Sequence, residues 1–422
     1  MIKTLDIESL SGIYESPTVK VVDTRPMSAF NGWRLGDEAR GGHIPRAVAF
    51  PHSWAAGMFD ADLVERLASK GLTPDQTIVL YGYGEDSFAL AGRMLDLGFD
   101  DVAVLAGGLH EWANREDLEM ARLPRNRQLV HPLWLHGVLG GEKVEEAPEG
   151  DFAVFHVNYG VPEEYERGHI PGAVHLDTNT LESASDWNRR SPEELEATLN
   201  RLGVTRDTTV IVYGRDTAAD PAEQKPGRKA GQIAATRAAA ILLYSGVSDV
   251  RLLDGGLNAW LAAGYPIETE IRTREASNGF GSPLPARPGF FIDFDEAVDL
   301  LADPNGVLVS IRSRPENRGK TSGYNYIEEL GDIQGAVWRN CGTDAYHMQH
   351  YRNVDNTMRD FNEVATVWSE VGITPEKKVA FYCGTGWRAS ETFFYAYLME
   401  WPNVSVYDGG WYEWSRRNGA KP

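Results

Sequence analysis

The sequence predicts an α/β protein built from three tandem copies of one domain, each a mainly parallel sheet with helices on both faces. The first observation is a repeat, because a Gly-x-Ile motif begins at positions 42, 168 and 331. The intervals are domain-sized, which indicates whole domains and not the turns of a solenoid. The second observation is that short apolar runs alternate with helical stretches in every copy. This alternation is typical of a parallel sheet covered on both faces.

Four elements recur in the same order in each copy: an apolar strand, the Gly-x-Ile motif, a second apolar strand and a Gly-Gly-x-x-x-Trp motif. We interpret the last motif as a turn into a helix that buries its tryptophan, which makes it a packing element. The elements occupy 21–26, 42–48, 78–82 and 105–112 in copy one, 152–157, 168–174, 210–214 and 253–260 in copy two, and 307–312, 331–337, 379–383 and 407–414 in copy three.

The composition between the copies predicts where the domains end. Charged residues fill 115–130, and glycine and proline recur through 268–290, which is typical of linkers. We therefore expect three domains, at 1–126, 127–272 and 286–422.

The bulk composition excludes several classes of function. The 422 residues carry a formal net charge of −20 with a pI near 5.0, so we expect neither nucleic acid nor an anionic membrane as a partner. No apolar run is long enough to span a membrane, and the first residues lack the apolar segment of a signal peptide. We expect a cytoplasmic protein, or a periplasmic one if a signal peptide has been removed from the sequence as given.

The chain has two cysteines, Cys341 and Cys383. Two cysteines in a chain of this length make neither a disulfide framework nor a structural zinc site. We expect no metal and no cofactor. Packing is the favoured role for Cys341, and a resolving thiol that forms a disulfide with Cys383 is the alternative.

The stretch 383–388 has the features of a reactive site. It lies between a predicted strand at 378–382 and a predicted helix at 389–399. A strand that turns tightly into a helix directs several backbone N–H groups into one concavity, and the helix N-terminus adds about half a positive charge. A thiol in such a concavity loses its proton more readily than a free cysteine. We therefore predict that Cys383 is a nucleophile, although a buried cysteine before an ordinary turn is the alternative. The predicted anion-binding cradle consists of Gly384, Thr385, Gly386, Trp387 and Arg388.

The three copies differ at the end of the second apolar strand. In copies one and two, Gly82 and Gly214 occupy the position that Cys383 occupies in copy three. Glycine supplies no nucleophile, so copies one and two are predicted to be inactive and to serve structure or to shape the substrate site. Copy three would carry any reaction.

These motifs resemble those of the rhodanese family of sulfurtransferases. The resemblance rests on the Asp-x-Arg strand, on residues 168–173, on the cysteine loop and on Gly-Gly-x-x-x-Trp, and it covers nearly the whole chain three times. Two inactive copies followed by an active one resemble the triple-domain members. The resemblance implies a doubly wound α/β fold and a persulfide on Cys383, whose charge the amides of 384–388 would hold. The sulfur would come from a small anionic donor and pass to cyanide or to a thiol of the thioredoxin or glutathione kind.

The donor implied by the resemblance stays open between 3-mercaptopyruvate and thiosulfate. The Gly-Thr-Gly of the loop is similar to that of mercaptopyruvate enzymes, and the resemblance then implies that Arg312 and Arg318 hold the substrate carboxylate. Arginine suits this task because it makes two parallel hydrogen bonds. An internal ion pair is the alternative for Arg312, and an exposed loop charge is the alternative for Arg318. Arg388 departs from the mercaptopyruvate loop and would favour thiosulfate, a doubly charged anion.

Further departures concern residues around the loop. Ser310 replaces the usual aspartate of the Asp-x-Arg strand, and Asp332 replaces the histidine of Gly-His-Ile. Trp387 replaces a small residue, and we expect it to wall the site, to bind a partner or to pack against copy one or two.

Two other functions fit parts of the sequence. A persulfide carrier or docking protein in a sulfur relay is one, because inactive copies offer surface without chemistry. A phosphatase or arsenate reductase is the other, since both use a cysteine loop with an arginine. A phosphatase loop reads Cys-x₅-Arg, whereas Cys383 and Arg388 enclose only four residues. The smaller cradle suits a sulfur atom better than a phosphate.

Overall fold

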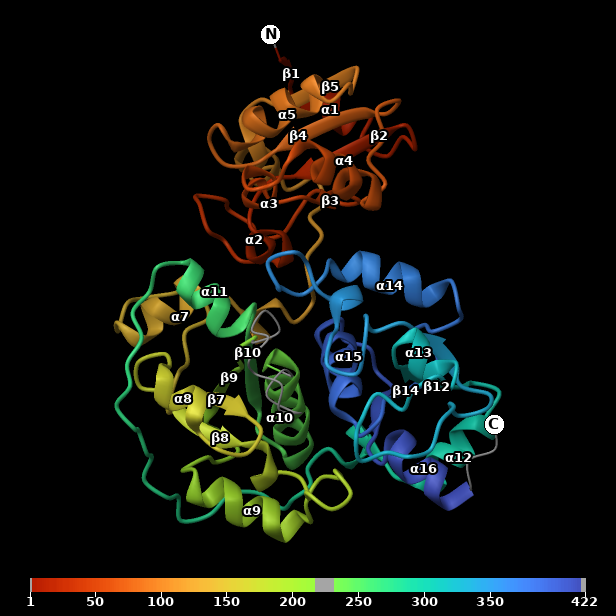
Figure 1. Cartoon of the computed structure of the whole chain (residues 1–422). Coiled ribbons are helices and arrows are strands. Elements are labelled where there is room, and N and C mark those ends of the chain that lie inside the picture. The colour runs from red at the N-terminus through yellow and green to blue at the C-terminus, as the bar shows by residue number, and fades with distance from the viewer. Residues whose placement is uncertain (1, 217–230, 419–422) are drawn as a thin grey trace. The chain divides into compact units, whose positions relative to one another are not determined.

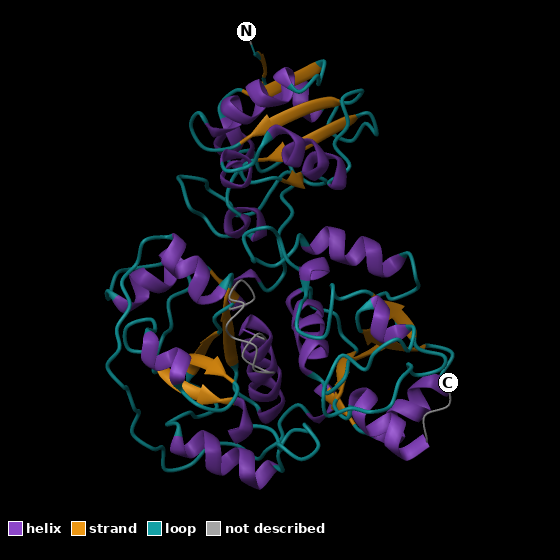
Figure 2. Cartoon of the chain, viewed as in Figure 1, coloured by secondary structure: helices purple, strands orange, loops and turns teal. Residues whose placement is uncertain are grey.

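The structure is a computed structural model that describes residues 2–216 and 231–418 (Figures 1 and 2). Copy one begins the chain. Its elements are β1 Lys3–Leu5, α1 Ile7–Ser11, β2 Val19–Asp23, α2 Met27–Asn31, β3 Val48–Ala49, α3 His52–Ala56, α4 Asp60–Ser69, β4 Thr77–Tyr81, α5 Asp86–Asp96, β5 Asp101–Leu105 and α6 Gly108–Ala113. The Asp-x-Arg motif ends β2, where the buried Arg25 pairs with Asp23 at 2.7 Å and with Glu38 at 3.1 Å.

Copy two repeats this succession. Its elements are η1 Asn126–Gln128, β6 Leu129–Val130, α7 Pro132–Leu139, β7 Phe152–Asn158, α8 Glu163–Arg167, β8 Val174–Asp177, η2 Thr178–Thr180, α9 Pro192–Arg201, β9 Thr209–Tyr213, α10 Gly231–Ser245, β10 Asp249–Leu253 and α11 Gly256–Ala262. Helix α9 begins with a capping box in which Ser191 and Glu194 satisfy each other's backbone N–H groups, as the sequence Ser-Pro-Glu-Glu favours.

Copy three ends the chain. Its elements are η4 Pro288–Phe290, β11 Phe291–Ile292, α12 Phe294–Ala302, β12 Gly306–Ile311, α13 Arg314–Asn317, β13 Val337–Arg339, η5 Gln349–Tyr351, α14 Phe361–Ser369, β14 Lys378–Tyr382, α15 Trp387–Leu398, β15 Val404–Tyr407 and α16 Gly410–Asn418. Side chains alternate across its strands, so Leu308, Ala380 and Tyr407 share one core with Ala297 of α12 and Trp411 of α16.

The strands of the three copies form three sheets of the same topology. The strand orders are β1-β5-β4-β2-β3, β6-β10-β9-β7-β8 and β11-β15-β14-β12-β13. Every pairing is parallel. The predicted α/β class with three copies of one domain is therefore confirmed.

Helices α10 and α15 join copies two and three, and Figure 1 shows them side by side. Every residue of both helices is buried. A helix that is buried all round needs cover on every side. Each helix packs on its own sheet, α10 on β9 and β10 and α15 on β14 and β15, and the remaining side of each is covered by the other helix. Copies two and three form one compact unit, Arg127–Pro422, and copy one forms another, Met1–Asn126.

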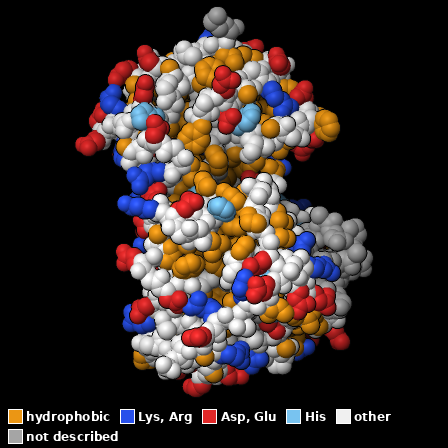
Figure 3. Space-filling view, turned by 90° about the vertical axis from the view of Figure 1, so that its left-hand side faces the viewer, with side chains coloured by type: hydrophobic (Ala, Val, Ile, Leu, Met, Phe, Trp, Pro, Cys, Tyr) orange, Lys and Arg blue, Asp and Glu red, His pale blue; other side chains and the backbone are white. Residues whose placement is uncertain are grey.

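The face of the molecule shown in Figure 3 has no concentration of basic side chains on its described part. Acidic and basic side chains are interspersed over the described part of the face in Figure 3, without a broad basic area. Among the described residues, none of the helices combines the length and the apolarity that a membrane crossing requires.

Gly82 and Gly214, which replace the cysteine in copies one and two, are closely surrounded by other atoms. A Cβ on Gly82 would lie 1.9 Å from the Thr24 hydroxyl oxygen. A Cβ on Gly214 would lie 2.1 Å from the carbonyl oxygen of Gly231 and 3.0 Å from the backbone nitrogen of Gln232. Copies one and two therefore lack room for a larger residue at this position, as well as lacking the nucleophile.

We predict that Gly214→Ala lowers the free energy of unfolding by about 1–3 kcal/mol, because the added methyl group meets backbone atoms that cannot rotate away. Urea unfolding of the full chain measures the effect. The matched control is Gly150→Ala, at an exposed glycine where a Cβ would meet nothing within 4 Å, and it should change stability by less than about 0.5 kcal/mol. Equal midpoints for the two variants would contradict the crowding at Gly214.

Candidate functional site

Cys383 lies at the carboxyl edge of the copy three sheet, directly after β14. Strand β12 pairs with β13 on one side and with β14 on the other. The chain therefore adds its next strand on one side of β12 and the following strand on the opposite side, which makes the space between β12 and β14 a reversal point of the sheet. Open parallel sheets bind their ligands at such reversal points. The Cys383 side chain is fully buried, so the residues around the loop decide how a reagent reaches the thiol.

The turn after Cys383 needs glycine at two positions for different reasons. Gly386 has a φ of 84° and caps α15, and this left-handed conformation is strained for residues with a Cβ. Gly384 allows a close approach, because a Cβ there would lie 2.2 Å from Cε2 of Tyr324. The helix begins at Trp387 and not at residue 389, since the left-handed Gly386 completes the turn two residues earlier than the sequence predicted.

The backbone of this turn offers hydrogen-bond donors. Among the described residues, no acceptor receives the N–H groups of residues 384–388. The carbonyl groups of Cys383 and Gly384 are occupied, because they accept from the N–H groups of Trp411 and Tyr412 at 2.9 and 3.0 Å. Unpaired N–H groups at a helix N-terminus create a positive potential that suits an anion.

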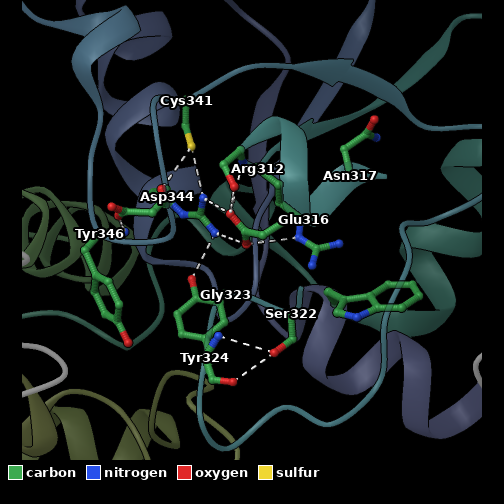
Figure 4. Close-up of polar contacts among 12 residues, drawn as sticks. Arg312, Glu316, Asn317, Ser322, Gly323, Tyr324, Cys341, Asp344 and Tyr346 are labelled. Atoms are coloured by element: carbon green, nitrogen blue, oxygen red, sulfur yellow. Dashed lines mark hydrogen bonds and ion pairs between the residues drawn. The ribbon is translucent and has the colours of Figure 1, made fainter. Parts of the chain in front are cut away.

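The guanidinium of Arg388 is held by a buried carboxylate. Its Nη1 and Nη2 donate to Glu316 at 2.9 and 2.7 Å. Figure 4 shows Glu316 with Arg312, Tyr324 and Cys341 grouped around it. Burial alone would raise the pKa of Glu316, but Arg388, Arg312 and a hydrogen bond from Ser313 lower it to about 2. The charge of Arg388 is thus balanced by Glu316 inside the protein. Both of its Nη atoms are bonded to this carboxylate, which argues against a role in binding the phosphate of a phosphatase substrate.

Cys341 lies beside Arg388. Arg388 Nη1 lies 3.0 Å from Cys341 Sγ, and this thiol lies 3.6 Å from the carbonyl oxygen of Asp344. Burial raises the pKa of the Cys341 thiol to about 11, although Arg388 opposes the shift. A buried thiol that keeps its proton at neutral pH suits the packing role that we favoured.

A pocket of about 280 Å³ lies between copies two and three and reaches the cysteine loop. Aromatic rings form most of its wall, and we call them the aromatic box. Between ring centroids, the distance from Trp387 to Tyr159 is 6.0 Å and the distance from Tyr159 to Trp187 is 5.5 Å. Trp187 stacks on Tyr326 with 5.0 Å between the ring centroids. Tyr326 is followed by Tyr324 at 5.2 Å and Tyr324 by Tyr346 at 5.9 Å. The aromatic box consists of Tyr159, Trp187, Tyr324, Tyr326, Tyr346 and Trp387, and the other lining residues are Ile233, Ala345, Thr385 and Arg388.

The pocket carries little net charge. Arg388 is the one charged residue among those that line it, and its charge is balanced by Glu316. Burial raises the pKa values of Tyr324 and Tyr326 above their usual range, so both hydroxyl groups stay neutral. The guanidinium carbon of Arg388 lies 5.8 Å from the ring centroid of Tyr324. Aromatic faces attract cationic groups, and clusters of such faces recognise quaternary ammonium ligands.

Arg312 lies outside this pocket, in an ion pair inside copy three. Its Nη1 lies 3.2 Å from Asp332, and its Nε lies 3.4 Å from Glu316. Asp332 also accepts from the Tyr382 hydroxyl at 2.6 Å. In copy one the carboxylate of Asp23, on the strand itself, accepts from Tyr81 at 2.8 Å and pairs with Arg25. The replacement of aspartate by Ser310 is thus compensated by the replacement of histidine by Asp332.

Arg318 is exposed at the end of α13 and does not line the pocket either. The structure therefore agrees with the alternative interpretations: Arg312 forms an internal ion pair, and Arg318 is an exposed charge. Their predicted role in holding a substrate carboxylate stays a prediction that the geometry does not support.

The position of Trp387 agrees with two of the three roles that we expected for it. Its ring walls the pocket, and its indole N–H donates to both carboxylate oxygens of Glu182 at 2.9 and 3.0 Å. The residue therefore walls the site and packs against copy two. Sequence reasoning missed the box residues of copy two and the tyrosines of 324–346, because they lie outside the repeated motifs. The cluster of tyrosines before and after 331 was the one signal that could have indicated them.

The chain is similar over its whole length to solved structures, one of which contains a cysteine persulfide. The chain superimposes on an anaerobic ergothioneine biosynthesis enzyme from Chlorobium limicola, in complex with trimethyl histidine, with a TM-score of 0.96 and 42% identity over 100% of this chain and 99% of that chain. It also superimposes on EanB, with a cysteine persulfide and ergothioneine, at a TM-score of 0.95 and 42% identity over 99% of each chain. In EanB the persulfide cysteine is separated from a substituted threonine and a substituted tyrosine by the same spacings that separate Cys383 from Thr385 and Tyr324.

Sequence comparisons agree with this likeness. The chain is 42% identical to the thiosulfate sulfurtransferase YnjE of Escherichia coli over 397 residues, 94% of this chain and 87% of that protein. It is 29% identical to the sulfur carrier protein TtuD of Thermus thermophilus over 279 residues, 61% of this chain and 85% of that protein. The family model of the rhodanese-like domain matches three times, at 6–115, 150–263 and 293–417. The chain therefore belongs to the rhodanese family of sulfurtransferases and carries the rhodanese-like domain in three copies.

Proposed function

We propose that Cys383 carries sulfane sulfur as a persulfide and delivers it to a small acceptor bound in the aromatic box. The observation that carries the proposal is that one loop serves both tasks. Its backbone N–H groups at 384–388 have no acceptor among the described residues, and its side chains Thr385, Trp387 and Arg388 line the pocket. A persulfide anion in the cradle would therefore stand next to a bound acceptor.

The reaction divides into two steps. In the first, the Cys383 thiolate attacks the outer sulfur of the donor, and the bond between that sulfur and the rest of the donor breaks. Thiosulfate loses its outer sulfur and leaves as sulfite. 3-Mercaptopyruvate loses its sulfur and leaves as the enolate of pyruvate, which becomes pyruvate by taking up the proton that the donor's thiol group carried. In the second step, the acceptor takes the outer sulfur and Cys383 regains its thiolate. YnjE, the thiosulfate sulfurtransferase, supports thiosulfate as the first donor to test.

The aromatic box supports one class of acceptor in particular, a heteroaromatic ring that carries a quaternary ammonium group. Arg388 is balanced by Glu316, so no free cation repels such a group. The enzyme from Chlorobium limicola is seen with trimethyl histidine, and EanB with ergothioneine. Transfer to the ring carbon needs no oxidant, because the persulfide and a C–H group give a thiol and a C–S–H group. A plain thiol or cyanide is the alternative acceptor.

We predict that incubation with thiosulfate adds one sulfur atom, about 32 Da, to the wild-type chain and that Cys383→Ser prevents the addition. Intact-protein mass spectrometry followed by peptide mapping measures this. Because the chain has two cysteines, Cys341→Ser is the matched control, and it should still acquire the sulfur. Sulfur found on the Cys341 peptide of the wild type, or retained by Cys383→Ser, would contradict the role of Cys383.

The count of turnovers separates an enzyme from a carrier. We predict that thiosulfate and cyanide give many equivalents of thiocyanate for each chain, because both small molecules reach the loop through the pocket. A single equivalent that stops at the loaded persulfide would instead favour the sulfur carrier, as TtuD is named.

We predict that trimethyl histidine binds the full chain at least about tenfold more tightly than histidine, because a desolvated quaternary ammonium gains about 2 kcal/mol on aromatic faces. Isothermal titration calorimetry gives both dissociation constants. Trp187→Leu should reduce the difference, and Phe59→Leu, at an exposed aromatic residue of copy one, should leave it unchanged. Equal affinities for the two compounds would contradict the proposed acceptor class.

A further inference from the structure

A hairpin of copy two, 182–189, forms part of the pocket that lies between copies two and three. Glu182 and Arg189 face each other in an antiparallel bridge at its base, and Trp187 near its tip stacks on Tyr326 of copy three. Copy two has no nucleophile, yet this hairpin supplies part of the aromatic box. The way in which it is held therefore bears on the pocket.

Glu182 holds the tryptophan that belongs to the cysteine loop. Its carboxylate is fully buried and accepts from the indole N–H of Trp387 at 2.9 and 3.0 Å. The same carboxylate accepts from Nε of Arg237, on α10, at 2.9 Å. One buried ion pair of copy two thus fixes the side chain of the first residue of α15.

Arg237 holds the other tryptophan. Its Nη2 donates to the carbonyl oxygen of Trp187 at 2.8 Å. Trp187 has a φ of 65°, in the left-handed region that a bulky residue adopts only when its surroundings impose it. Such backbone strain concentrates at binding sites, and here Arg237 bonds to the strained peptide itself. The Glu182–Arg237 pair therefore connects both tryptophan walls of the pocket.

Several other charged or titratable groups face this pair. Asp408, at the end of β15, lies 2.8 Å from Nη2 of Arg237 and 3.0 Å from Nη1 of Arg189, which also reaches Asp293 at 3.1 Å. The charge of Glu182 also contributes to the raised pKa values of the Tyr159 and Tyr326 phenol groups. Burial raises the pKa of Glu182 to about 7, with a further increase from Asp408, while Arg237 and Trp387 oppose the shift.

We propose that Glu182 and Arg237 are positioning residues that set the affinity of the pocket for its acceptor, by holding Trp187 and Trp387 in place. The inference rests on the proposed function of Cys383 and the aromatic box. It assigns the inactive copy two a direct part in the second step of the reaction and none in the loading of Cys383. Because the pair needs a charged Glu182, its effect weakens as the pH falls from about 8 to about 6.

The test compares the wild type, Glu182→Gln and the matched control Glu196→Gln, an exposed glutamate on α9, as full-length chains. Persulfide loading from thiosulfate is measured by intact mass, and the dissociation constant of trimethyl histidine by calorimetry at about pH 6 and pH 8. We expect equal loading in all three chains. At pH 8, Glu182→Gln should bind about tenfold more weakly than the wild type, and at pH 6 the ratio should approach one. The ratio cancels the titration of the ligand's own imidazole.

A ratio near one at both pH values, or the same weakening in Glu196→Gln, would overturn the proposal. A wild type that fails to load sulfur would contradict the proposed function of Cys383 instead. The indole N–H resonance of Trp387, assigned with Trp387→Phe, gives a readout that needs no ligand. It should shift between pH 6 and pH 8 in the wild type and stay constant in Glu182→Gln. If Glu182→Gln does not fold, Arg237→Lys replaces it, and a dissociation constant at pH 8 equal to that of the wild type would overturn the proposal.

Discussion

The contact between α10 and α15 is the constraint on which the site depends. Both helices are buried along their whole length, so each would expose apolar surface if copies two and three separated. The contact is reciprocal, since each copy extends a hairpin onto the other. The hairpin of copy two, 182–189, brings Trp187 onto Tyr326 of copy three. In copy three, an antiparallel bridge between Arg352 and Met358 closes a second hairpin, and the N–H of Met358 donates to Asp254 of copy two at 2.8 Å. The pocket exists only in the joined pair.

The placement of charge around the pocket bears on the acceptor that we propose. A loop with an arginine after the cysteine suggests an anion site, but Glu316 neutralises Arg388 inside copy three. The positive potential that remains comes from backbone N–H groups and is confined to the cradle. Under the proposed function, the cradle would hold a small sulfur anion while the aromatic box beside it holds a neutral or cationic group. This division would allow a persulfide and a cationic acceptor to occupy neighbouring places.

The repeated motifs predicted the fold well because local patterns determine them. The apolar runs and the Gly-x-Ile spacing predicted three parallel sheets. The aromatic box could not be predicted, since Trp187 and Tyr324 meet only through the packing of two copies. The motifs also did not predict the ion-pair partner of Arg312. In copy one the partner of the equivalent Arg25 is Asp23, on the strand itself, whereas in copy three the carboxylate comes from Asp332, in another motif. Pairing across copies is a property of tertiary contact and leaves no periodic signal in the chain.

A crystal structure of the full chain after treatment with thiosulfate would test the central claim most directly. The account predicts one additional sulfur atom bonded to Sγ of Cys383, with backbone nitrogens of 384–388 within about 3.5 Å of it and the aromatic box adjacent to it. An unmodified Cys383, or an added sulfur that points away from these nitrogens, would contradict the account.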